Sequence, residues 1–361
     1  MLVDSQTQEI QSRDAQERQM SSLERRQTRP TRDAAIDFTK GSLVLFMVLY
    51  HWLNYFVGSE GHYYNYLRFL TPSFIFISGF MISRIQLSRH ENRSRDLAKR
   101  LAVRGFKLLA LVSLLNVVLS FARTGFAVRS AILVETLRNI CWAFVVANPA
   151  ASAGQKSVAF SMLVPIAYLL ILSAGIVSLA NRQRNAFLYT LFALIVVVML
   201  SYSYGMVSSY LDLLMIGVLG VNIGFTEKEQ MSSVLSHPYL LIVLYFCYLG
   251  VITIWNVTLP LQVISVILTT ALLYIAGSGR APGAAWRLTV LLGKYSLLGY
   301  IAQIAILQGL RRIPWLSQHG VSILLASLLL GMLLTVMIVE ATDFARRNSP
   351  RADRVYRLVF A

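Results

Sequence analysis

Ten apolar runs of membrane-spanning length constrain this chain more than any other feature. Each run holds roughly 20 residues, which is the number that an α-helix needs to cross the hydrocarbon core of a bilayer. The runs lie at residues 38–57, 63–83, 101–121, 157–180, 186–204, 207–225, 237–255, 259–277, 288–310 and 321–341. With 56% apolar and only 14% charged residues, an ordinary soluble domain is excluded. We therefore expect an all-α polytopic membrane protein, with about ten transmembrane helices in one bundle.

The distribution of lysine and arginine predicts the orientation of these helices. If both termini lie in the cytoplasm, 26 of the 33 basic residues fall on the cytoplasmic side and 7 on the outer side, as the positive-inside rule requires. The formal charge of +16 would also suit a nucleic-acid-binding protein. Because the charges are gathered between apolar runs rather than along one soluble face, we expect membrane lipid and no nucleic acid as a partner.

Three stretches outside the apolar runs complete the expected organisation. Residues 1–35 are polar and rich in Gln, Ser and Arg, which predicts a disordered cytosolic tail rather than a signal peptide. Residues 36–345 form the expected transmembrane domain, and residues 346–361 a basic cytosolic C-terminal tail. Within the longest outer segment, residues 130–147 are apolar enough either to span or to re-enter, and the charge count favours re-entry.

The first apolar run carries ionisable side chains in helical register. Asp37 and Lys40 stand at its start and His51 near its far end, with Met47 on the same face. Lys40 and His51 are eleven residues apart, which corresponds to about 16 Å and three turns of helix. Since an ionisable side chain inside a membrane is costly, such a stripe indicates a functional site.

His51 is the strongest candidate for chemistry. We interpret it as a general base for proton transfer, with Asn54 one turn further on to fix its tautomer. The alternative is a histidine hydrogen-bonded between helices as a packing residue. Asp37 and Lys40 also have an alternative explanation, because an aspartate favours the helix N-terminus and a lysine reaches the headgroups.

Further candidates lie on the second and third runs. Arg100, Arg104 and Lys107 share one face at the start of the third run. This cluster fits the phosphates of a bound ligand and anionic lipid equally well. In the second run, Ser78 precedes a glycine that allows close approach of another helix. Arg68, near the outer end of that run, is placed to meet a substrate from outside.

Motifs for other chemistries are missing. The chain has no P-loop, no HExxH and no GxSxG, and its histidines and cysteines lack zinc-binding spacing. Cys141 and Cys247 lie in apolar surroundings, and we interpret both as packing residues. We therefore expect no metal site.

The first two runs resemble the opening of the membrane acyltransferase superfamily. That group holds the acyltransferase-3 proteins and the heparan-alpha-glucosaminide N-acetyltransferase-like proteins. The stretch IDFTKGSLVLFMVLYH (36–51) is similar to a family segment with an aspartate, an Arg-Gly pair and a histidine further along. Ser78-Gly79-Phe80 is similar to the end of the second family helix. Arg104 and Lys107 match a paired-basic motif, and residues 211–220 and 292–300 look like later family segments.

The match carries motifs over about the first 110 residues. Three positions depart from the family pattern: Lys40 replaces an arginine and loses its bidentate fork, Lys107 replaces a second arginine, and Gln303 stands where many relatives carry a histidine.

The resemblance implies an enzyme of a bacterial inner (plasma) membrane. Such an enzyme moves an acyl group, commonly acetyl, from cytosolic acyl-CoA to a hydroxyl or amine of a glycan or glycolipid. His51, with Asp37, would be catalytic, either by deprotonating the acceptor or by carrying the acyl group. The expected CoA-binding residues are Lys40, Arg100, Arg104 and Lys107, and the expected substrate-binding residues are Ser78, Arg68 and Asn54.

Two other functions remain open at this point. One is a transporter or exporter of a small anion or a lipid-linked sugar, and the other is a non-catalytic partner in polysaccharide assembly. The sequence does not decide the acceptor, the acyl chain length, the choice between direct transfer and an acyl-histidine, or the oligomeric state.

Overall fold

The computed structural model describes residues 33–58, 61–87, 94–123, 138–141, 144, 160–180, 183–279, 283–313 and 321–360. All regular structure in these ranges is helical, and no strand occurs among them. Most of the expected N-terminal tail lies outside the described residues, as does most of the apolar stretch 130–147. The tail prediction and the choice between a spanning and a re-entrant segment therefore stay predictions.

Within the described ranges, most of the helices follow one another along the chain with short connections. The ten predicted runs each coincide with a helix or with a pair of helices. Their bounds are α2 (Ala34–Trp52), η1 (Leu53–Val57), α3 (Tyr63–Leu67), α4 (Leu70–Met81), η2 (Ile82–Leu87), α5 (Ser94–Arg123), α7 (Leu163–Leu179), α8 (Gln183–Ser203), α9 (Ser209–Gly224), α10 (Lys228–Leu235), α11 (Pro238–Ile254), α12 (Leu259–Ser278), α13 (Ala284–Lys294), α14 (Ser296–Arg311), α16 (Val321–Asn348) and α17 (Pro350–Phe360). The elements η1 and η2 are π-helical turns that prolong α2 and α4.

Six helical stretches within the described residues are long and apolar enough to cross a membrane. The helices α7, α9 and α11 are apolar but shorter, with 17, 16 and 17 residues. The six stretches are Ala34–Val57, Tyr63–Leu87, Arg95–Phe121, Gln183–Ser203, Leu259–Ser278 and Ser322–Asn348. The described part of the chain is thus all-α, with several helices that are suited to cross a membrane, as predicted. The number of ten spans and the cytoplasmic termini stay predictions.

The ninth predicted run is not one straight helix. Residues 288–310 form two helices instead of one continuous helix, because α13 and α14 meet at an angle of 95°. The break lies at Tyr295, whose backbone (φ −113°, ψ 30°) leaves the helical region. The hydroxyl of Tyr295 donates a 2.6 Å hydrogen bond to Asp343 Oδ1 on α16. This contact from far along the chain holds the break, and no local signal predicts it.

Glycines bring two pairs of helices into backbone contact. A Cβ added at Gly79 of α4 would come within 3.0 Å of backbone atoms of Gly217 and Val221 on α9. In the same way, a Cβ at Gly41 of α2 would come within 3.0 Å of backbone atoms of α13. The glycine after Ser78 therefore allows close helix approach, as its sequence context predicted.

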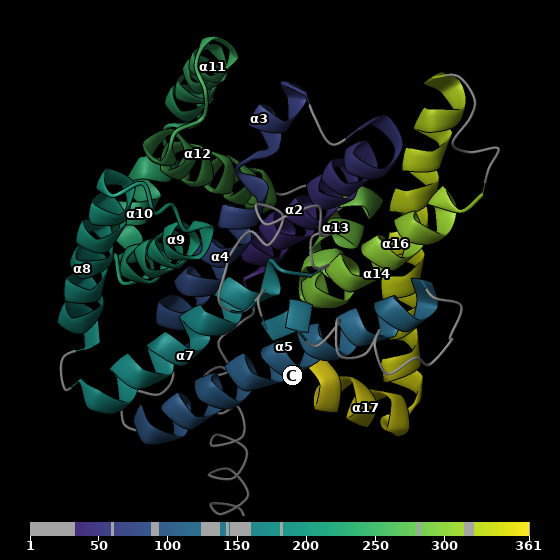
Figure 1. Cartoon of the computed structure of the whole chain (residues 1–361), viewed down its shortest axis with the longest axis horizontal. Helices are drawn as coiled ribbons and strands as arrows, with labels where there is room; N and C mark the ends of the chain where they lie inside the picture. Colours follow the sequence, from purple (N-terminus) through teal and green to yellow (C-terminus); the bar gives the residue numbers. More distant parts are fainter. Residues whose placement is uncertain are drawn as a thin grey trace, which may run out of the picture. The chain divides into compact units, whose positions relative to one another are not determined.

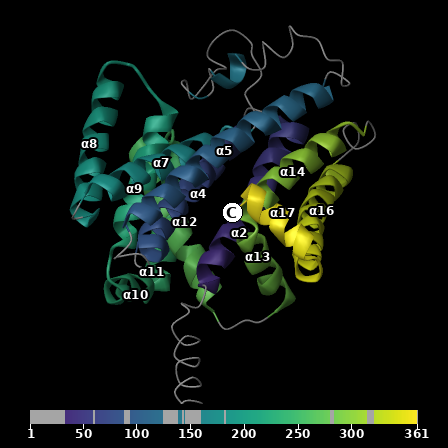
Figure 2. The same cartoon turned by 90° about the horizontal axis from the view of Figure 1, so that it is seen from below.

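Figures 1 and 2 show how the remaining helices pair. Helix α5 runs alongside α7, and Gly105 leaves room for the side chain of Ile171 at their contact. Helix α14 packs against α16, and α11 against α12. The expected tail from residue 346 is helical as far as Phe360, because α16 continues to Asn348 and α17 follows.

Candidate functional site

The start of α2 holds a buried ion pair. The distance from Lys40 Nζ to Asp37 Oδ1 is 2.8 Å, and the two side chains are 11% and 5% exposed. Helix α13 covers this turn, since Gly293 packs directly on the backbone of Asp37. Lys40 therefore contacts Asp37 inside the protein, and its side chain is buried.

His51 lies three turns further along α2, surrounded by tyrosine rings. Its ring centroid is 5.3 Å from that of Tyr50 and 6.2 Å from those of Tyr55 and Tyr300. The Nε2 atom is buried and has no hydrogen-bond partner among the described residues. A buried nitrogen of this kind costs about 1–3 kcal/mol, so a substrate or a water molecule is the natural partner.

Asn54 does not orient the imidazole, contrary to the sequence-based expectation. Its Oδ1 accepts a 3.2 Å hydrogen bond from the hydroxyl of Tyr64. The physical reason is the π-helical turn η1, which begins at Leu53 and widens the spacing beyond that of an α-helix. Asn54 is thereby carried away from His51 and toward α3.

A polar cavity of about 710 Å³ opens beside these residues. It brings together two residues that the sequence marked for substrate binding, Arg68 and Asn54. It also contains polar side chains that were not predicted as substrate-binding, from helices well separated in the chain. These are Tyr50, Tyr64, Asn65, Thr71, Tyr202, Asp212 and Gln262.

Charged groups of both signs line this polar cavity. Asp212, only 9% exposed, accepts a 3.0 Å hydrogen bond from the hydroxyl of Tyr202 through Oδ2. Arg68 donates from Nη1 to the carbonyl of Val257 at 3.3 Å, and its own carbonyl accepts from Gln262 Nε2 at 3.2 Å. The sequence signal for Asp212 was its position as an acidic residue within an otherwise apolar run.

Tyr50 connects His51 with the polar cavity. Its ring makes edge contacts with His51 and, at a centroid distance of 5.5 Å, with Tyr64. Both tyrosines line the polar cavity, whereas His51 does not. Tyr50 therefore contacts His51 and also lines the polar cavity.

A second cavity, of about 240 Å³, is apolar. It lies at the start of α2, where Ile36 and Thr39 line it together with side chains of α4, α10 and α12. The hydroxyls of Thr39 and Thr270 donate to carbonyls of their own helices, at 2.8 and 2.6 Å, and so leave the wall apolar. Both cavities are lined by α2, α4, α9 and α12, the polar one toward the end of α2 and the apolar one toward its start.

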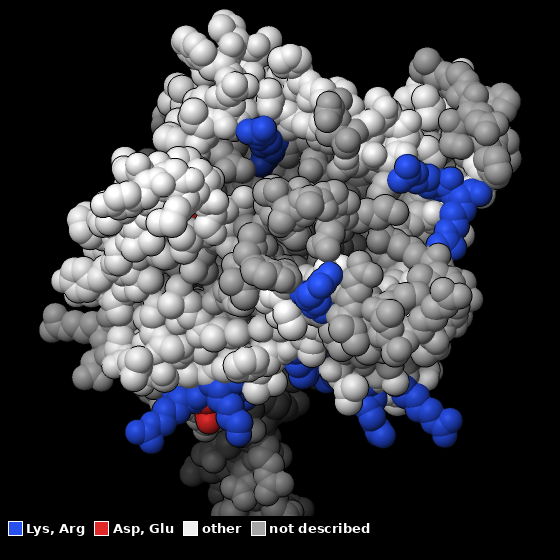
Figure 3. Space-filling model, in the orientation of Figure 1, with Lys and Arg blue, Asp and Glu red and all other residues white. Residues whose placement is uncertain are grey.

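The four expected CoA-binding residues fall into two groups. Lys40 is buried against Asp37, whereas Arg100, Arg104 and Lys107 are exposed on α5. None of the four lines either cavity. On the face in Figure 3, several basic side chains gather along the lower edge, with smaller groups elsewhere.

Ser78 is used within its own helix. Its hydroxyl donates a 2.8 Å hydrogen bond to the carbonyl of Phe74, and the residue lines neither cavity. With Gly79 packed on α9, this motif has a structural explanation. Gln303 is different, because it is fully buried on α14 and neither polar atom of its side chain has a partner in the described structure.

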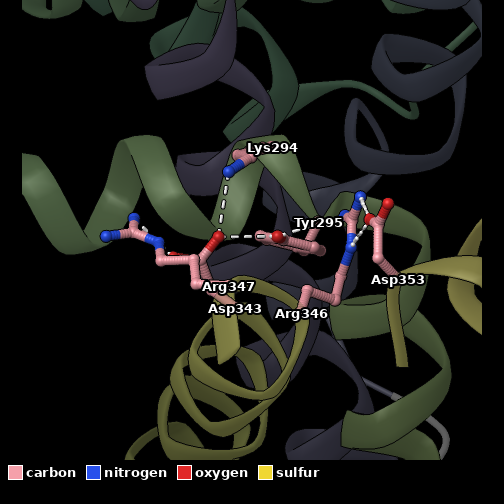
Figure 4. A network of polar contacts seen from close by, with 6 residues as sticks. All are labelled: Lys294, Tyr295, Asp343, Arg346, Arg347 and Asp353. Carbon is pink, nitrogen blue, oxygen red and sulfur yellow. Dashed lines mark hydrogen bonds and ion pairs between the residues drawn. The ribbon is translucent and has the colours of Figure 1, made fainter. Parts of the chain in front are cut away.

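A polar network, shown in Figure 4, joins the α13–α14 break to the C-terminal helices. Asp343 accepts hydrogen bonds from Lys294 Nζ at 2.9 Å and from the Tyr295 hydroxyl, and pairs with Arg347 at 2.5 Å. Arg346 binds Asp353 through Nε and Nη2, at 2.9 and 2.5 Å. The Arg346 guanidinium lowers the pKa of the Asp353 carboxyl below its ordinary 3.8.

Comparison of the chain with protein-family models, with curated proteins and with solved structures gave no match. Across the described ranges, no group of three or more His, Cys, Asp or Glu side chains is arranged to hold a metal ion.

Proposed function

We propose that this chain is an integral membrane acyltransferase of the superfamily that its first helices resemble. It would move an acyl group, in the first instance acetyl, from cytosolic acyl-CoA to a hydroxyl or amine of a glycan or glycolipid. The observation that carries the proposal is the Nε2 atom of His51, which is buried and without a partner. It lies next to Tyr50, which lines a large polar cavity.

The chemistry assigned to His51 is proton transfer. Nε2 takes the proton of the acceptor hydroxyl while its oxygen attacks the thioester carbonyl carbon. The carbon–sulfur bond then breaks, and the CoA thiolate takes the proton from the imidazolium. In the second route, Nε2 attacks the thioester carbonyl carbon and the carbon–sulfur bond breaks, which releases the CoA thiolate. The acceptor oxygen then attacks the acyl carbon, the nitrogen–acyl bond breaks, and the acceptor proton passes to the thiolate. A positioned general base contributes typically 10²–10⁴-fold to the rate.

The polar cavity is the proposed acceptor site. Its volume of about 710 Å³ lies within the range of ligand pockets, roughly 300–1,000 Å³. The guanidinium of Arg68, the carboxylate of Asp212 and the amide of Gln262 supply the mixed donors and acceptors that a polyhydroxylated ligand requires. Tyr50 and Tyr64 add aromatic surface.

The acyl donor is assigned to the opposite end of α2. Lys40 is about 16 Å and Asp37 about 21 Å from His51 along the helix, and this end would face the cytoplasm. The exposed Arg100, Arg104 and Lys107 on α5 would bind the phosphates of CoA at the membrane surface. We propose that the protein lies in a bacterial inner membrane, with both termini inside and ten spans.

A transfer assay with purified protein tests the proposal. Radiolabelled acetyl-CoA and a mixture of glycan acceptors are supplied to the wild type, to His51→Ala and to His237→Ala. His237 is an exposed histidine before α11 and serves as the matched control. We expect His51→Ala to lose at least 10²-fold in rate and His237→Ala to keep the wild-type rate. Wild-type transfer by a folded His51→Ala variant would refute the catalytic role.

One observation favours a second function, export of a lipid-linked sugar. Both the polar and the apolar cavity are lined by residues of α2, α4, α9 and α12. The polar cavity would accept the sugar of such a lipid, and the apolar cavity its hydrocarbon chain. Movement of a labelled lipid-linked sugar across vesicles without consumption of CoA would support this function. Neither activity in a folded protein would favour a non-catalytic partner in polysaccharide assembly.

A further inference from the structure

The last helix, α17, begins one residue after the membrane-spanning stretch that ends at Asn348. Ser349 caps it, since the Ala352 N–H donates to Ser349 Oγ at 3.4 Å, and Pro350 occupies its first position, which suits a residue without an N–H. Figure 1 shows α17 running across the end of α16 rather than continuing it. The chain therefore places α17 at the membrane surface.

One face of α17 is anchored to the rest of the molecule. The ring of Tyr356 packs edge-on against Tyr295 at 5.3 Å, and Phe360 stacks on Tyr356 at 4.9 Å. The Arg346 guanidinium lies 4.0 Å from the centroid of the Tyr356 ring and pairs with Asp353. These contacts (Figure 4 shows the ion pair) determine which residues the helix presents outward.

The opposite face combines exposed apolar and cationic side chains. Val355 is 64% exposed and Leu358 is 73% exposed. Arg351 and Arg354 are exposed beside them, and Arg357, which is also exposed, pairs with Asp353 at 2.7 Å. From residue 343 to residue 360 the chain carries five arginines against two aspartates, a surplus of three positive charges. Arginines interleaved with large apolar residues on a short helix are typical of segments that lie in a lipid headgroup layer.

We infer that α17 binds the anionic headgroups of the membrane that holds the protein. Arg351 and Arg354 contact lipid phosphates, while Val355 and Leu358 enter the boundary with the acyl chains. The surplus of positive charge selects an anionic lipid surface, and the one-residue link to α16 keeps the helix within reach of it. This inference does not depend on the acyltransferase proposal.

A fluorophore at position 358 tests this inference in the intact protein. Leu358→Cys carries an environment-sensitive dye in a Cys141→Ser, Cys247→Ser background, because both native cysteines are exposed. The protein is placed in nanodiscs of phosphatidylcholine, with and without phosphatidylglycerol. We expect blue-shifted emission, quenched by nitroxide-labelled acyl chains, when phosphatidylglycerol is present. Changing Arg351 and Arg354 together to Gln should weaken the lipid-seated state on the order of thirtyfold.

The control is Arg287→Gln, which removes an exposed arginine of α13 and should leave the emission unchanged. Arg346→Gln keeps Arg351 and Arg354 but removes the ion pair between Arg346 and Asp353 that holds α17 in place. The emission band should become broader and should still respond to phosphatidylglycerol. Equal emission in the two kinds of nanodisc, or emission typical of water in both, would overturn the inference. So would an apolar signal that survives in the double arginine variant.

Discussion

Replacing Gly41 by alanine tests the close packing that positions the site. A Cβ at this position would lie 2.8 Å from the carbonyl carbon of Thr289 and 2.9 Å from the nitrogen of Gly293, and closer still to the Thr289 oxygen. Ordinary contact begins at 3.4 Å. Because all three atoms belong to the backbone of α13, no side-chain rotation relieves the clash. The carbonyl carbon alone requires a displacement of 0.6 Å, the difference between 3.4 and 2.8 Å, and the closer oxygen requires α2 and α13 to move apart by more than that.

The expected cost of Gly41→Ala is about 1–3 kcal/mol, as for other overpacked interiors. The matched control is Gly175→Ala on α7, where an added Cβ has nothing within 4 Å. That change should stabilise by roughly 0.5–1 kcal/mol, because alanine loses less backbone freedom in a helix. Thermal unfolding in detergent, monitored by size-exclusion chromatography, gives the melting temperatures of the two variants. If Gly41→Ala melts at or above the wild-type temperature, the packing described for α2 and α13 is wrong.

Three further outcomes follow from the structure. Lys40→Met removes the buried cation beside Asp37 and should destabilise by about 3–5 kcal/mol, whereas adding Asp37→Asn should restore much of the loss in the same melts. The lowered pKa of Asp353 stabilises the docking of α17 above the ordinary pKa of 3.8, and this contribution is lost as the pH falls through the lower folded value. The protection factors of the α17 amides, which compare the observed exchange rate with the intrinsic rate at the same pH, should therefore be unchanged between pH 7 and pH 5 and fall only below pH 3.8. Arg68→Gln, at the polar cavity, should raise the acceptor KM several-fold and leave the KM for acyl-CoA unchanged, and an effect on acyl-CoA alone would remove the cavity from the acceptor path.

The helices themselves could be predicted from the sequence, because apolar runs of a given length have few other solutions in a membrane. The close approach at Gly79 was also predictable, since a small residue in an apolar helix points to a neighbouring backbone. The partner on α9 was not predictable, because nothing in the second run encodes which distant helix supplies it.

The bend at Tyr295 and the polar cavity could not be predicted for the same reason. The bend depends on a hydrogen bond to Asp343, which is 48 residues further along the chain. The polar cavity collects one or two polar side chains from each of several helices, so that no single segment carries its signature. The position of Asn54 relative to His51 was predicted wrongly, because a single π-helical turn changes the residue spacing that an α-helix would give.

The proposed acyl transfer requires an acyl thioester to reach His51. A structure of the protein with a non-hydrolysable acyl-CoA analogue tests this requirement most directly. We predict density for the analogue along α2 from the Lys40 end, with its carbonyl carbon about 3.5 Å from His51 Nε2, the separation of reacting atoms before attack. Density for the analogue elsewhere, with the imidazole still enclosed by Tyr50, Tyr55 and Tyr300, would contradict the account.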